Sequence, residues 1–114
     1  MNPFVLVGIG GAVGAMARYT TARLLERELV DTLSVNVLGS VLLGLLVTAP
    51  AGDAVALAAG TGFCGAFTTF SSFAVETVQL AGDGELRTAA LYAGGMFAAA
   101  LVGVLIGGTL GGAL

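Results

Sequence analysis

Four long apolar segments follow one another along the chain, separated by short connections that carry charged and turn-forming residues. They cover residues 3–25, 32–49, 54–80 and 85–114. Each segment is continuously apolar instead of alternating, which favours helices over strands, and a helix needs roughly 20 apolar residues to cross a bilayer. The pattern predicts an all-α integral membrane protein with four transmembrane helices. Residues 1–114 then form a single transmembrane unit, with no length left for a soluble domain.

The composition supports a membrane protein and excludes several other classes. Of the 114 residues, 57% are hydrophobic and only 10% are charged, whereas soluble domains carry about a quarter charged residues. The only basic residues are four Arg, too few and too scattered to bind nucleic acid. There is no His and a single Cys, which excludes an internal disulfide and argues against a His- or Cys-built metal site. We expect Cys64 to be a small buried thiol.

The distribution of Arg predicts the orientation in the membrane. Arg18, Arg23, Arg27 and Arg87 all lie in or beside the first and third connections, which share one side of the membrane. Basic loops face the cytoplasm. We therefore expect a multi-pass protein of the cell membrane with both termini outside.

Glycines recur at a spacing of four residues in the first and last segments. Gly10 and Gly14 form one such row, and Gly103, Gly107 and Gly111 form another. This spacing lets two helix backbones approach closely inside a membrane. The rows predict tight helix packing.

The third segment predicts a helix broken near its middle. Glycines and hydroxyl residues crowd residues 60–73, and both weaken a continuous helix. Non-helical backbone at membrane depth must be buried in protein or line a wet cavity, where its carbonyls could hold a cation.

Phe67, Phe70 and Phe73 recur every three residues, close to one helix face. They either pack in a core or turn their positive ring edges toward an anion.

Polar groups elsewhere in the segments also suit a small, strongly hydrated anion. Asn36 and Ser40 lie one turn apart on one helix face, where they either join two helices or line a pathway. Arg18 lies near one mouth of such a pathway. Apart from Glu85 at the start of the fourth segment, Glu76 is the only carboxylate inside a segment, whereas a cation pathway would be lined by several acids.

Three stretches resemble the Fluc (CrcB) family of fluoride channels. They are GGAVGAMARY at residues 10–19, TLSVNVLGS at 32–40 and GFCGAFTTFSSF at 62–73. The resemblance covers the first three segments in order. It implies a fluoride-selective channel subunit, not an enzyme, which exports fluoride passively through two pores in an antiparallel dimer.

The resemblance also implies roles for individual pore residues. Phe70 and Phe73 would form an aromatic box along the pore, and Asn36 would supply a vestibule amide. Ser71 and Ser72 would supply hydroxyls beside them.

The resemblance also implies residues for a sodium site and for the mouth of the pore. The backbone carbonyls of Gly65 and Thr68 would bind a structural sodium ion at the dimer interface, with one pair from each chain. Arg18 matches the arginine near the cytoplasmic vestibule, and Glu76 matches a membrane glutamate.

The fourth segment departs from the family pattern. The family often has Ser four residues after the tyrosine of its polar track, but here Tyr92 is followed by Met96. Methionine cannot donate a hydrogen bond to an anion. With the Arg bias, this departure suggests a heterodimer with an oppositely oriented homologue as the alternative to a homodimer.

Two other functions fit a chain of this size. A small four-helix proton-coupled multidrug exporter would need a titratable acid in its first span, and residues 3–17 contain none. A structural membrane subunit would use its glycine-rich faces only for packing against a partner.

Overall fold

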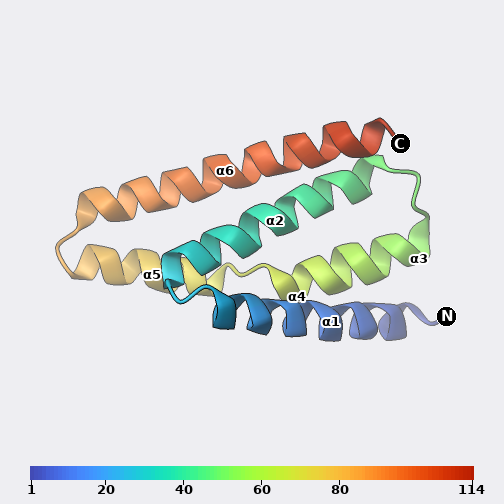
Figure 1. Ribbon diagram of the computed structural model, residues 1–114, viewed down its shortest axis with the longest axis horizontal. Helices are drawn as coiled ribbons and strands as arrows, with labels where there is room; N and C mark the ends of the chain where they lie inside the picture. The colour runs from blue at the N-terminus through green and yellow to red at the C-terminus, as the bar shows by residue number, and fades with distance from the viewer.

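The computed structural model describes residues 1–114 as an elongated helical bundle of 49 × 28 × 22 Å (Figure 1). Four stretches are long and apolar enough to cross a membrane, which confirms the predicted spans. The elements are α1 (Pro3–Leu24), α2 (Glu28–Thr48), α3 (Asp53–Val55), the π-helix η1 (Ala56–Cys64), α4 (Gly65–Phe67), α5 (Ser71–Gly82) and α6 (Leu86–Gly112). The third span therefore consists of several helical pieces, α3 to α5.

Local sequence signals explain where the helices begin. The Asn2 side chain accepts a hydrogen bond from the Phe4 amide at 2.7 Å, and Pro3 occupies the first turn of α1. The second span was predicted to begin at residue 32, but α2 begins at Glu28. This expectation was wrong because Glu28 and Asp31 lie in the first helical turn, where carboxylates interact favourably with the helix dipole.

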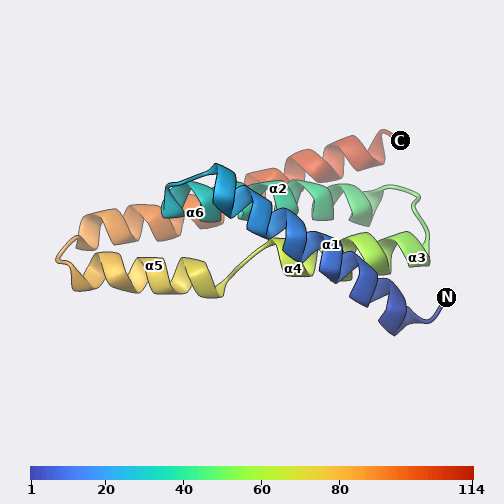
Figure 2. The same ribbon diagram turned by 60° about the horizontal axis from the view of Figure 1, so that its bottom comes forward.

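The third span loses its helical backbone at residues 68–70. Helix α4 ends at Phe67, Thr68 has an extended ψ of 164°, and α5 begins at Ser71. Figure 2 shows this connection stretched between α4 and α5. The two halves of the third span are thus separate helices joined by a short extended segment.

Glycines bring the helix backbones into contact, as their spacing predicted. A Cβ atom at Gly10 or Gly14 would collide with the backbone of Ala58 or Phe63, and one at Gly107 would collide with the Val41 carbonyl. These contacts join α1 to η1 and α6 to α2, the two main helix pairs of the fold. The small residues are therefore required for the spacing of both pairs.

Most large apolar side chains lie on the outside of the bundle. Only 16 of the 114 residues are buried, and exposed apolar side chains occur on every span. Cys64 is among the buried residues, as expected. Such an apolar exterior suits lipid or another protein chain, and not water.

Replacing Gly107 by Ala should destabilise the α2–α6 pair, because the new methyl group has no space against the Val41 carbonyl. We expect the midpoint of thermal unfolding in detergent to fall by about 5 °C or more. The buried Cys64 thiol provides the readout, since a thiol-reactive dye labels it only after unfolding. The matched control is Gly112→Ala on the same helix, where a Cβ meets nothing within 4 Å. Equal midpoints for the two variants would contradict the packing argument.

Candidate functional site

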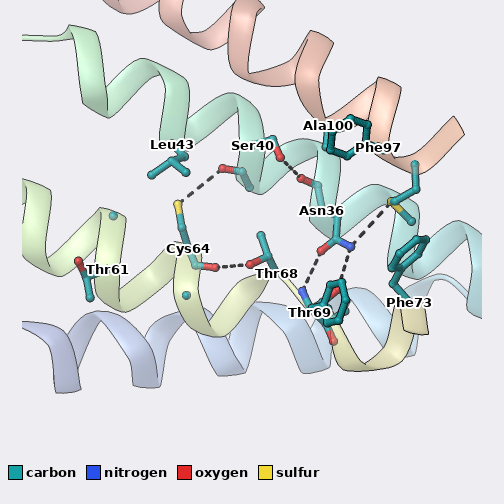
Figure 3. A pocket seen from close by; sticks show the side chains of 15 residues that line it. Asn36, Ser40, Leu43, Thr61, Cys64, Thr68, Thr69, Phe73, Phe97 and Ala100 are labelled. Carbon is teal, nitrogen blue, oxygen red and sulfur yellow. Dashed lines mark hydrogen bonds between the residues drawn. The ribbon is translucent and has the colours of Figure 1, made fainter. Parts of the chain in front are cut away.

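The candidate site consists of two cavities, one at the helix break and one between the start of α5 and the first connection. The first, which we call the break cavity, has a volume of about 460 Å³ and is shown in Figure 3. The second, the mouth cavity, has a volume of about 500 Å³ and lies where α1, α2 and α5 approach the first connection. The break cavity is lined by, among others, Asn36, Gly65, Thr68, Phe70, Phe73 and Met96. The mouth cavity includes Arg18, Asp31, Ser71, Ser72 and Glu76.

Asn36 holds the non-helical backbone through two hydrogen bonds. Its Nδ2 donates to the Thr69 carbonyl at 2.9 Å, and its Oδ1 accepts from the Thr69 amide at 2.8 Å (Figure 3). A backbone amide and carbonyl left without partners at membrane depth would each cost several kcal/mol. The carboxamide of α2 therefore replaces the helical hydrogen bonds that Thr69 has lost.

The break also frees two carbonyls. No backbone hydrogen bond ends on the carbonyls of Gly65 or Thr68, since the Thr69 amide is directed to Asn36 and the Ser72 amide to Thr69 Oγ1. Both residues line the break cavity, and a Cβ added at Gly65 would meet nothing within 4 Å. These two oxygens are available to a ligand.

Met96 takes part in the same cluster. Its thioether sulfur accepts a weak hydrogen bond from Asn36 Nδ2 at 3.8 Å, and the side chain is buried. On the other side, Ser40 Oγ donates to the Asn36 backbone carbonyl at 2.6 Å. Asn36 and Ser40 both line the break cavity, so their predicted shared face is confirmed. The side-chain donor of Asn36 is engaged within this chain.

The aromatic side chains separate at the break. The Phe70 and Phe73 ring centroids lie 6.0 Å apart at 58°, and Phe73 lies 5.5 Å from Tyr92 at 44°. Phe67 does not share their face as predicted. It is buried and stacked on Phe63 at 5.3 Å, because the extended backbone at Thr68 interrupts the helical spacing.

The hydroxyl residues after the break face the mouth cavity. Arg18 Nη2 donates to Ser72 Oγ at 3.3 Å, and the Ser72 amide donates to Thr69 Oγ1 at 3.1 Å. Ser71 Oγ lies 3.4 Å from the same Thr69 oxygen. Ser71 and Ser72 therefore line the cavity that contains Arg18, whereas Phe70 and Phe73 line the break cavity.

Glu76, which lines the mouth cavity, joins three helices. Thr32 Oγ1 donates to its Oε2 at 3.0 Å, and the Tyr92 hydroxyl donates to its Oε1 at 2.7 Å. The side chain is only 9% exposed. Tyr92 lines neither cavity, and its hydroxyl is bound to this carboxylate.

Sequence reasoning missed three residues of the site. Thr32 precedes Asn36 by four residues, so its place on the polar face of α2 could have been read from spacing. Asp31 was assigned to a connection, although it is buried beside the mouth cavity. Thr69 was seen only as one hydroxyl among several, and no sequence signal identifies it as the partner of Asn36.

Chemically, the two cavities combine neutral polar groups, aromatic rings, one cation and, at the mouth, four carboxylates. The break cavity offers hydroxyl, amide and aromatic groups, and the mouth cavity adds the guanidinium of Arg18. Such groups can replace water around a small anion during passage through a membrane.

Comparisons with known proteins agree with this architecture. The model of the family described as CrcB-like protein, Camphor Resistance (CrcB), matches residues 5–108. A relative from Natronomonas pharaonis, named fluoride-specific ion channel FluC 2, is 56% identical over 108 residues, which cover 95% of this chain and 93% of the relative.

Further relatives carry the same name. One from Haloarcula marismortui is 52% identical over 87% of this chain and 85% of its own length. Another from Moorella thermoacetica is 41% identical over 97% of this chain and 98% of its own length. Because the family match and these similarities extend over nearly the whole sequence, the chain belongs to the CrcB family.

Proposed function

We propose that this chain is a subunit of a fluoride-selective channel that carries fluoride passively out of the cell, driven by its gradient and the membrane potential. The observation that carries this proposal is the 56% identity to a fluoride-specific ion channel over 95% of the chain. The site is compatible with that role, since amide, hydroxyl and ring-edge donors suit a small hydrated anion. A channel needs no catalytic group, and we propose no enzymatic activity.

An antiparallel dimer is the proposed assembly. Channels and transporters often place their ion sites between two halves of opposite orientation. This chain has no visible internal repeat, so a second chain must supply the second half. Phe70 lines the break cavity and is 78% exposed, which leaves its ring available to a partner. The partner is a second copy or an oppositely oriented homologue, and the Arg bias supports a fixed orientation with both termini outside.

A structural sodium ion at the dimer interface is proposed at the freed carbonyls of Gly65 and Thr68. Unwound backbone carbonyls are typical sodium ligands in membrane proteins. The absence of backbone hydrogen bonds to these two oxygens fits that role. A second chain in the opposite orientation would bring the same pair. The ion would stabilise the interface, while Asn36 would keep the break in place.

Two rival functions, a proton-coupled drug exporter and a structural subunit, each leave a feature of the chain unexplained. Helix α1 contains no carboxylate, which argues against proton-coupled drug export. A purely structural subunit would explain the glycine packing but not the donors of the two cavities. The flux experiments distinguish such a structural subunit from a channel.

Liposomes containing the purified chain should release fluoride rapidly and retain chloride, as measured with ion-selective electrodes. Efflux from the chain alone means that it forms a functional homodimer. Efflux only after addition of an oppositely oriented homologue means a heterodimer. Absence of fluoride efflux in both cases would contradict the channel function and favour a structural subunit.

Replacing Phe70 by Ala should reduce fluoride efflux at least about tenfold, because the pathway loses an aromatic edge at the break. Folding should be unaffected, since the side chain is 78% exposed. Phe97→Ala is the matched control, as Phe97 lines the same cavity and is also exposed. Both variants should elute as dimers in size-exclusion chromatography. A loss of assembly without loss of flux per dimer would assign Phe70 to packing against the partner and not to the ion pathway.

Removing sodium should weaken the assembly. In buffers in which N-methylglucamine replaces sodium, we expect a lower thermal midpoint from the Cys64 dye assay, since an ion that binds only the folded dimer stabilises it. Potassium at equal ionic strength controls for general salt effects. Identical midpoints in all three buffers would argue against the sodium site.

A further inference from the structure

The mouth cavity has an unusual charge balance for the entrance of an anion pathway. Arg18 is its only cation, whereas four carboxylates also line it. The acidic residues are Glu26, Glu28, Asp31 and Glu76. Their effects on an incoming anion differ, because their surroundings differ.

Asp31 is the carboxylate without an obvious role. Glu76 accepts hydrogen bonds from Thr32 and Tyr92, and Glu26 and Glu28 are exposed to solvent. Asp31 is only 8% exposed, and its Oδ1 atom is buried without a hydrogen-bond partner. Arg18 Nε is the one other side-chain polar atom that is buried without a hydrogen-bond partner.

Arg18 and Asp31 thus present opposite charges to one cavity. The guanidinium donates to Ser72, and Oδ1 of Asp31 accepts no hydrogen bond from it or from any other group. A buried charge is screened less than an exposed one. At equal distance, an anion bound at Arg18 is therefore repelled more by Asp31 than by the exposed Glu28.

We propose that Asp31 is a positioning residue for conduction, which weakens the anion site at Arg18 so that fluoride leaves it quickly toward the pore. Conduction requires a site that attracts the ion but does not retain it. Arg18 supplies the attraction, and the Asp31 carboxylate limits it. This inference rests on the proposed fluoride channel function.

A purely structural role for Asp31 makes a different prediction. Asp31 lies in the first turn of α2, where any carboxylate interacts favourably with the helix dipole. Glu28 occupies the same turn and also lines the mouth cavity, but it is exposed. A dipole effect would therefore appear in both residues as a change in stability, without a specific change in ion binding.

The test compares Asp31→Asn with the matched control Glu28→Gln in the liposome assay. The initial rate of fluoride efflux is measured as a function of internal fluoride concentration. For Asp31→Asn, the half-saturating concentration should fall roughly fivefold, the order of effect expected when one unit charge that faces the same cavity is removed in a high dielectric. The maximal rate should fall as well, because the ion leaves Arg18 more slowly. For Glu28→Gln, the curve should stay close to that of the unsubstituted protein.

Several outcomes would overturn the inference. An unchanged concentration dependence for Asp31→Asn would do so, as would an equal shift in Glu28→Gln. If Asp31→Asn does not assemble, Asp31→Ser removes the same charge with a smaller side chain and should give the same shift. Absence of fluoride efflux from the unsubstituted protein, alone or paired, would overturn the proposed function. Normal efflux with an unchanged curve would overturn only the role of Asp31.

Discussion

The two hydrogen bonds between the Asn36 carboxamide and the backbone of Thr69 make the extended segment of the third span possible. Inside a bilayer, a backbone amide or carbonyl without a partner costs several kcal/mol, so an unsupported break would revert to helix or unfold. Asn36 supplies both partners from a neighbouring helix, at 2.9 and 2.8 Å. The extended backbone at Thr68 then separates Phe67, which stays in the core, from Phe70 and Phe73 at the cavity.

The glycine contacts give this break a rigid frame. Helix α6 lies against α2, and α1 lies against η1, with backbones too close for any added Cβ at Gly107 or Gly10. Glu76 adds a polar link between the first turn region of α2, helix α5 and helix α6. Because both halves of the third span are anchored to continuous helices, the site is held in place before any ion arrives.

The break cavity and the mouth cavity contain polar groups of different chemistry. Phe70, Phe73 and the residues with freed carbonyls line the break cavity, whereas Arg18, Ser71 and Ser72 line the mouth cavity. A charged group near the entrance attracts an anion from water, and neutral donors deeper in the bilayer avoid the cost of burying a full charge. Under the proposed channel function, this division would separate capture of an ion from its passage.

The sequence by itself determined the four spans, the tight glycine packing and the polar faces, because these follow from apolar length and from spacings within one helix. It also carried the motifs that relate the chain to its family. Only the tertiary structure decided that Asn36 binds Thr69, that Thr32 and Tyr92 bind Glu76, and that the buried Asp31 lines the same cavity as Arg18. These partners come from different helices, and their contact depends on how the helices are aligned and rotated against one another. No spacing along a single helix contains that information.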